Sequence, residues 1–272
     1  MKLFLFDEGE SFLHRLNPLT KLVAAVVIFI GLTAIVDPVT PLLITLLTVL
    51  AIWLLGRVRL GLLIRSLSPI VVLSFGVVWS TVLFYQADPG SHPRVLGKVG
   101  PFPITDQAVA YALVIAFRML GFFTVSLFFV LTTDPSDLVQ ALIQRLGLSY
   151  RFGYGAHAAY RFVPLFDSEL TTIRAAHRVR GVRGGGPTAQ IRQYVGFVVP
   201  LLASAIRRAE RVALAMEARG FGASPRRTYY RRSTFSLDDV RFAGGTVIVI
   251  GGALTLLSSL GWLGQLIPPF IK

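Results

Sequence analysis

The stretch QAVAYALVIAFRMLGFFTVSLFFVL, residues 107–131, contains a single charged residue, Arg118. Because an α-helix rises about 1.5 Å per residue, about 20 apolar residues suffice to cross the hydrocarbon core of a bilayer. This stretch is therefore long and apolar enough to span a membrane. The composition agrees, since 54% of the 272 residues are hydrophobic and only 15% are charged, against about 25% charged residues in an ordinary soluble domain.

Four further apolar stretches qualify as spans: residues 22–36, 41–55, 67–85 and 242–267. Asp37, Pro38 and Pro41 lie between the first two, where they favour a tight turn. We therefore predict an all-α integral membrane protein with about five transmembrane helices. The acids in MKLFLFDEGE, at the start of the chain, are not typical of a removable signal peptide. The chain has no cysteine, which excludes disulfides and thiolate metal sites.

The distribution of basic residues predicts the orientation of these spans, because Lys and Arg concentrate on the cytoplasmic side. Residues 134–241 hold 17 arginines and 8 acidic residues, so this polar segment carries most of the net charge of +13. We expect it and the N-terminus to be cytoplasmic, in the plasma membrane of a prokaryote. The positive charge is thus explained by topology, and we expect no nucleic acid partner. Three regions are predicted: 1–131 with four spans, 132–241 as a cytoplasmic domain, and 242–272 as a C-terminal transmembrane helix.

The cytoplasmic segment has the pattern of three helices. The first follows Asp134 and Pro135, which suit a helix start, and stops at Gly147. A second helix is predicted over residues 156–180 with a kink at Pro164, and a third helix continues past Pro200 to Arg219. On the apolar face of the third helix, alanines recur every four residues, at Ala205, Ala209 and Ala213. Since small side chains let helices approach closely, we expect the two long helices to cross there.

Several kinds of chemistry have no sequence signal here. None of the four lysines lies in a glycine-rich phosphate loop, so the chain does not resemble an ATPase. The predicted spans contain no acid and no histidine, which argues against coupling to an ion gradient. His14, His92, His157 and His177 do not have the spacing of a metal site or a catalytic triad. We expect no catalytic residue and no metal ligand.

Arg118 is the one charge near the middle of a predicted span. An arginine that faces lipid is costly, by at least about 2.5 kcal/mol. One interpretation is therefore an intramembrane contact with a partner protein or with backbone carbonyls. The other is that the long side chain reaches the membrane interface, as basic side chains near the ends of transmembrane helices do. Both interpretations remain open at this point.

The two long cytoplasmic helices end alike, in IRAAHRVRG at residues 173–181 and ALAMEARGFG at residues 213–222. An arginine complements the negative end of a helix dipole, and a following glycine lets the chain leave in the left-handed conformation. Capping alone explains one such ending. It does not explain two equivalent endings, each with an arginine before a glycine.

These residues resemble the transmembrane T component of energy-coupling factor transporters, the family that includes cobalt- and nickel-type T proteins. The stretches SFLHRLNPLTKL, FFVLTTDPSDLVQAL, YRFVPLFDSEL and PLLASAIRRAERVALAMEARGFG are similar to segments of that family, and the resemblance covers nearly the whole chain. The family has an Ala-Arg-Gly tripeptide at the end of each of two long cytoplasmic helices. The second tripeptide is intact here as Ala218, Arg219 and Gly220, whereas the first is Val179, Arg180 and Gly181, with valine in place of alanine.

The resemblance implies a subunit of an importer for a vitamin or a transition-metal ion. Its partners would be two cytoplasmic ABC ATPases, each docking one arginine tip, and a membrane S component that captures the substrate. Val179 suggests that the two ATPases form a heterodimer. ATP and Mg²⁺ would bind the ATPases, and this chain would bind no cofactor and catalyse no reaction. Two alternatives come from the residues: an intramembrane enzyme, and a scaffold whose basic run RRTYYRR, residues 226–232, binds anionic lipid.

Overall fold

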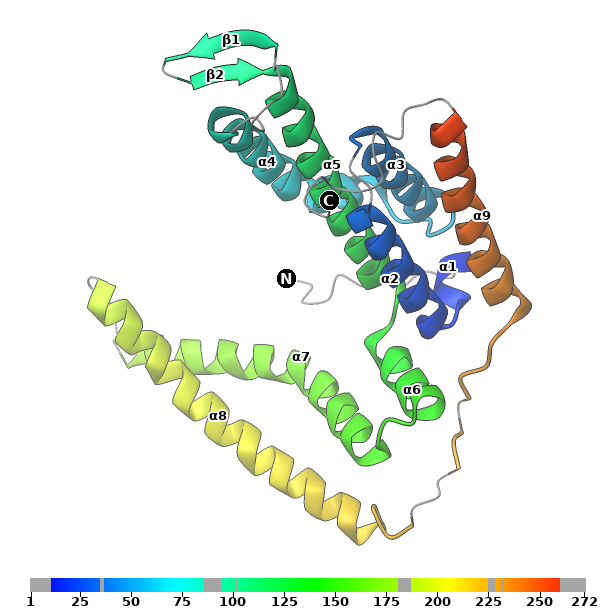
Figure 1. Ribbon diagram of the computed structural model, residues 1–272. Helices are drawn as coiled ribbons and strands as arrows, with labels where there is room; N and C mark the ends of the chain where they lie inside the picture. The colour runs from blue at the N-terminus through cyan, green and yellow to red at the C-terminus, as the bar shows by residue number, and fades with distance from the viewer. Residues whose placement is uncertain are drawn as a thin grey trace. The chain divides into compact units, whose positions relative to one another are not determined.

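The computed structural model of the chain describes residues 11–34, 37–85, 94–100, 102–180, 187–224, 228–230 and 232–259. Over these residues the chain is almost entirely helical and divides into two compact units (Figure 1). One unit is Pro135–Ser233, which we call the coupling unit after the role that the family resemblance implies. The other, called the membrane unit, comprises the described residues up to Asp134 and from Thr234. The coupling unit is thus shorter at both ends than the predicted 132–241 domain. The two predicted membrane regions, 1–131 and 242–272, belong to a single unit.

The membrane unit consists of six described helices and a hairpin. The helices are α1 (Phe12–Arg15), α2 (Pro18–Ala34), α3 (Val39–Leu54), α4 (Leu60–Phe84), α5 (Asp106–Thr132) and α9 (Leu237–Ser259). Among the described residues, α4 and α5 are long and apolar enough to cross a membrane, and α2 and α3 are shorter apolar helices. The predicted last span, residues 242–267, matches α9 as far as Ser259, and the remainder lies outside the described residues.

Helix α4 begins seven residues before the predicted span of residues 67–85. Its first two turns include Arg65 and the helix continues through Pro69, so it extends beyond the purely apolar window. Further along, Val72 is 73% exposed and Phe75 is 71% exposed in the described structure. Large apolar side chains on such an outer face suit contact with hydrocarbon rather than with water.

Helix α5 lies at the centre of the membrane unit, packed against α2, α3 and α4 (Figure 1). Gly121 permits this packing, because a Cβ atom there would lie 3.1 Å from side-chain atoms of Leu32 and of Thr45. Near the other end of α5, Leu127, Phe128 and Leu131 join a buried apolar cluster from α1, α3 and α4. The apolar stretch that opens the sequence is therefore both a span and the core of its unit.

A short hairpin, which the sequence did not predict, precedes α5. Strand β1 (Val95–Val99) pairs antiparallel with β2 (Phe102–Thr105), and Gly100 at the turn has φ 59°. The ring of Phe102 contacts that of Phe84 edge to face at 5.4 Å, which holds the hairpin against the end of α4. Thr105 then caps α5, since its hydroxyl accepts a hydrogen bond from the Ala108 amide at 3.2 Å.

Side chains at the start of α2 form hydrogen bonds with the two points where the chain leaves and re-enters the membrane unit. Lys21, which is 1% exposed, donates from Nζ to the carbonyl of Thr132 at 2.5 Å, at the end of α5. Asn17 donates from its side-chain amide to the carbonyl of Thr234 at 3.3 Å. The Asn17 backbone amide also donates to Asp239 Oδ1 at 2.7 Å, which joins α2 to α9. A buried ammonium at a helix C-terminus is favoured by the helix dipole.

The coupling unit contains α6 (Pro135–Leu146), α7 (Tyr150–Val179) and α8 (Pro187–Ala218). Helices α6 and α8 end where the sequence predicted, and Gly147 after α6 has φ 69°. Helix α7 begins six residues earlier than predicted and bends along its length (Figure 1), with Pro164 inside it, as expected for a proline that removes a helix hydrogen bond. Gly153 lets α6 approach α7, because a Cβ atom there would lie 2.3 Å from Ile143.

Candidate functional site

The second arginine tip is a complete Schellman motif. Helix α8 ends at Ala218, and Gly220 follows with φ 74°. The amide of Gly220 donates to the carbonyl of Glu217 at 2.8 Å, and that of Phe221 to the carbonyl of Met216 at 2.9 Å, which is the hydrogen-bond pair of this motif. A Cβ atom on Gly220 would meet nothing within 4 Å, so glycine is required there by the backbone angle and not by space.

The chain that leaves this tip is held against the first turns of α7. The ring of Phe221 lies edge to face with Tyr150 at 5.7 Å and with Tyr154 at 5.8 Å. Arg151 donates to the carbonyl of Gly222 at 3.2 Å, and the Tyr150 hydroxyl donates to the carbonyl of Ser224 at the same distance. We call these side chains of Tyr150, Arg151, Tyr154 and Phe221 the tip brace.

The tip brace was missed by the sequence reasoning, which began the helix at residue 156. The signal available was Ser149, a helix-capping residue type, directly before the aromatic run that starts at Tyr150. Ala218, Arg219 and Gly220 are themselves exposed. The second tip is therefore an exposed arginine on a helix end whose exit path is fixed by aromatic packing and backbone bonds.

The first arginine tip is described up to Arg180. Helix α7 ends at Val179, which is 89% exposed, and Arg180 is exposed as well. The Arg180 amide donates to the carbonyl of Ala176 at 3.1 Å, which caps the helix. Gly181 lies outside the described residues, as do residues 226, 227 and 231 of the basic run. The equivalence of the two tips stays a prediction.

Among the described residues, an ion pair and a ring contact join helices α7 and α8. Glu169 accepts hydrogen bonds from the Ser204 hydroxyl, at 2.6 Å, and from the Arg208 guanidinium, with which it forms an ion pair. Nearer the first tip, the rings of His177 and Phe197 lie edge to face at 5.0 Å. Glu169, which interrupts the apolar pattern of α7, thus has its ionic partner on the facing helix.

The predicted crossing residues lie on another face of α8. Ala205 is half-buried, whereas Ala209 and Ala213 are exposed together with Leu202 and Ile206. Helix α7 does not cover Ala209 and Ala213 within this unit, and the crossing at the alanine row stays a prediction. The ion pair of Glu169 places the face of α8 that carries Arg208 against α7.

Arg118 is half-buried in α5. Arg118 lies in the membrane unit, and the described residues of both arginine tips lie in the coupling unit.

The chain matches a known family along most of its length. The family model described as cobalt transport protein, CbiQ, matches residues 9–230. A protein of Streptococcus thermophilus named energy-coupling factor transporter transmembrane protein EcfT is 32% identical over 240 residues, which cover 85% of this chain and 89% of that protein. The EcfT protein of Brevibacillus brevis is 31% identical over 263 residues, covering 93% and 94%.

A third relative is a longer protein, and one region of it is similar to this chain. A putative ABC transporter ATP-binding protein of Bifidobacterium longum is 28% identical over 257 residues, which cover 91% of this chain but 32% of that protein. The region similar to this chain is therefore about a third of a protein that is named for ATP binding.

Proposed function

This chain belongs to the CbiQ cobalt transport protein family, as a transmembrane T component of an energy-coupling factor transporter, and from this membership we propose how it couples ATP hydrolysis to transport. Two cytoplasmic ABC ATPases bind the arginine tips, and a membrane S component carries a vitamin or a transition-metal ion. ATP and Mg²⁺ bind the ATPases, and this chain is a membrane subunit without catalysis of its own. The relative named for ATP binding supports a close association with an ATPase.

The observation that carries the docking proposal is the geometry of the second tip. Arg219 is exposed at the end of a 32-residue helix, and the left-handed Gly220 turns the chain away immediately after it. A guanidinium presents five N–H donors in a planar fork, which suits a groove lined by carboxylates or backbone carbonyls. The tip brace fixes the chain on the far side of the arginine, so less conformational entropy is lost when an ATPase binds.

Helix α7 is the element that relates the two docking points. Its C-terminal end carries Arg180, and its N-terminal turns contribute Tyr150, Arg151 and Tyr154 to the brace of the Arg219 tip. We propose that closure of the ATPase dimer on ATP displaces both ends of this helix, and that the contact of Glu169 with Arg208 transmits the motion to α8. The exposed alanine row of α8 then passes the motion to the S component, with Arg118 as a further contact within the membrane.

Charge reversal at the tips tests the docking proposal. Arg180→Glu and Arg219→Glu are each expected to weaken ATPase binding roughly 30-fold or more, because loss of an arginine hot spot costs about 2 kcal/mol or more. The measurement is the amount of each ATPase that copurifies with the tagged chain, together with substrate uptake in vesicles. The matched controls are Arg174→Glu on α7 and Arg211→Glu on α8, both exposed arginines away from the tips. If the tip variants retain both ATPases and normal uptake, the docking proposal is wrong.

A further inference from the structure

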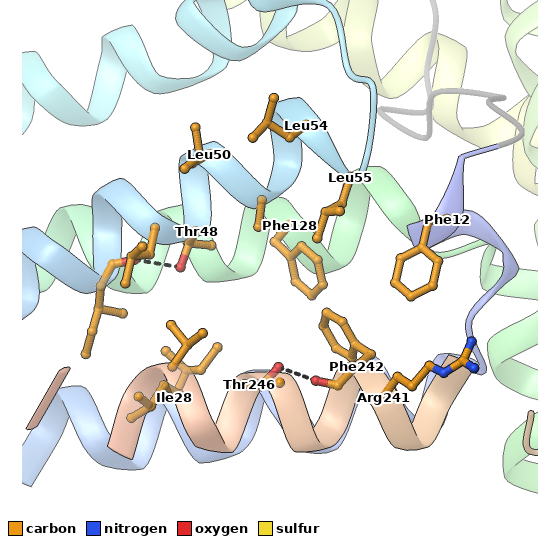
Figure 2. Close-up of a pocket in the computed structure, with 16 residues that line it drawn as sticks. Phe12, Ile28, Thr48, Leu50, Leu54, Leu55, Phe128, Arg241, Phe242 and Thr246 are labelled. Atoms are coloured by element: carbon orange, nitrogen blue, oxygen red, sulfur yellow. Dashed lines mark hydrogen bonds between the residues drawn. The ribbon is translucent and has the colours of Figure 1, made fainter. Parts of the chain in front are cut away.

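The membrane unit contains an apolar cavity of about 470 Å³ between α3 and α9. Figure 2 shows Leu50, Leu54 and Leu55 on the α3 side and Phe242 and Thr246 on the α9 side. The ring of Phe128 from α5 lies between the two helices, stacked on Phe242 with a centroid distance of 6.0 Å. A volume of this size is within the range of about 300–1,000 Å³ that holds small ligands.

The walls of the cavity offer no free polar group among the lining residues whose hydrogen bonds are described. The hydroxyl of Thr48 donates to the carbonyl of Ile44, and that of Thr246 donates to the carbonyl of Phe242, both at 2.8 Å (Figure 2). Both hydroxyls are thereby satisfied within their own helices. The remaining uncharged lining is aliphatic or aromatic, so the interior suits a hydrocarbon chain and would penalise a polar ligand.

One end of the cavity is positively charged. Arg241 lines that end next to Phe12 (Figure 2). Its side chain is 74% exposed and donates from Nη1 to Asp238 at 3.0 Å, which engages one of the five N–H donors of a guanidinium. Two chain segments that line this end of the cavity lead to further exposed arginines. Helix α1 carries Phe12 and ends at Arg15. Leu55, after α3, is followed by Arg57 and Arg59.

Among the described residues, two acidic side chains lie near this end, and they do not cancel its charge. Asp239 is buried and accepts hydrogen bonds from the amides of Asn17 and Ser236, both at 2.7 Å, so it is engaged inside the protein. Asp238 pairs with Arg241 and balances one of the four arginines. The cavity therefore joins an apolar interior to a cationic mouth, which is the arrangement that complements a lipid with an anionic headgroup.

We propose that this cavity is a binding site for an anionic phospholipid. One acyl chain lies between α3 and α9 against Phe128 and Phe242, and the phosphate of the headgroup binds Arg241. This proposal does not rest on ATPase docking at the arginine tips. It requires only that α3 and α9 lie in a membrane. One arginine near the headgroup is worth about fivefold for an anionic over a zwitterionic lipid.

The test is native mass spectrometry of the full-length chain, extracted from nanodiscs that contain equal amounts of phosphatidylglycerol and phosphatidylcholine with identical oleoyl chains. We expect one retained lipid and a preference of about fivefold for phosphatidylglycerol. Dioctanoyl phosphatidylglycerol, with its shorter chains, is expected to be lost. Retention of the short-chain lipid at the same level would show binding by the headgroup alone and would overturn the proposal, as would retention of no lipid.

Two pairs of variants separate the acyl chain from the headgroup. Gly245 lines the cavity and Gly244 does not, and a Cβ atom at either position would meet nothing within 4 Å. Gly245→Leu is expected to abolish retention of both lipids, whereas Gly244→Leu retains them. Arg241→Gln is expected to remove the headgroup preference without loss of the lipid, and the matched control, Arg94→Gln beside β1, is expected to keep it.

Ala51→Leu, which fills the cavity from the α3 side, guards against misfolding of the Gly245→Leu variant. It is expected to reduce lipid retention in the same way, with an unchanged gel-filtration profile. The proposal is overturned if both cavity-filling variants are folded and still retain phosphatidylglycerol, or if Arg241→Gln keeps the full preference for it.

Discussion

At the scale of single residues, the second tip depends on side chains that never contact an ATPase in our proposal. Gly220 provides the left-handed turn, and Phe221 anchors the exit path between Tyr150 and Tyr154. Arg151 adds a bond to the carbonyl of Gly222, which itself has φ 91°. Phe221 is thus flanked by two left-handed glycines, and its aromatic packing holds this short segment in place.

Phe221→Ala is therefore expected to weaken binding of the ATPase that occupies the Arg219 tip, although the arginine itself is unchanged. An edge-to-face aromatic pair contributes about 1 kcal/mol, so we expect about a fivefold loss of affinity. The measurement is titration of the purified chain with its ATPases. The control is Phe152→Ala, an exposed aromatic residue of α7, which should bind normally. Equal affinities for all three proteins would show that the tip brace does not position Arg219.

At the scale of elements, the contact between α7 and α8 depends on a partly buried polar group. Glu169 and Arg208 are both about three-quarters covered, at 23% and 27% side-chain exposure, and Arg208 also lies 6.0 Å from the ring of Phe162. Charged groups in such an environment are costly when one partner is removed. The ion pair therefore fixes which faces of the two helices meet.

A double-mutant cycle with Glu169→Gln and Arg208→Gln measures this contact. Each single variant is expected to lower the unfolding free energy by about 1 to 3 kcal/mol, because it leaves a partly buried charge without its ionic partner. The double variant should lose less than the sum, with a coupling energy of about 1 kcal/mol. Thermal unfolding of the purified proteins gives these values. Additive losses would mean that the two side chains do not interact.

The elements differ in how far the sequence predicted them. Helices α6 and α8 were predicted well because their boundaries are local, at Pro135, Gly147 and Gly220. The hairpin was missed, since its strands are short and interrupted by glycine and proline. The partner of Glu169 could not be predicted either, because Arg208 lies 39 residues away and the choice between faces of α8 depends on packing. The arginine and glycine of the second tip are thus readable in the sequence, whereas the contacts that brace this tip are not.

At the scale of the whole molecule, charge predicts which side of the membrane each segment occupies. The absence of native cysteines makes this directly testable with single cysteine variants. Lys98→Cys, in the hairpin, is expected to react with a membrane-impermeant maleimide in intact cells. Residues 86–106 hold only Arg94 and Lys98 as basic residues against Asp88 and Asp106, so this segment is predicted to lie on the outer side. Arg211→Cys, exposed on α8, should react only after the membrane is opened. The opposite labelling pattern would contradict the predicted orientation.

The bonds made by the first turn of α2 have a consequence for the ancestry of such chains. Thr132 and Thr234, where the polypeptide leaves the membrane unit and comes back to it, are held by Lys21 and Asn17 of one helical turn. Neighbouring attachment points are what a domain insertion requires. Residues 135–233 therefore have the topology of an exchangeable cassette, and a chimera that takes this cassette from a relative has to match its host at only two adjoining junctions.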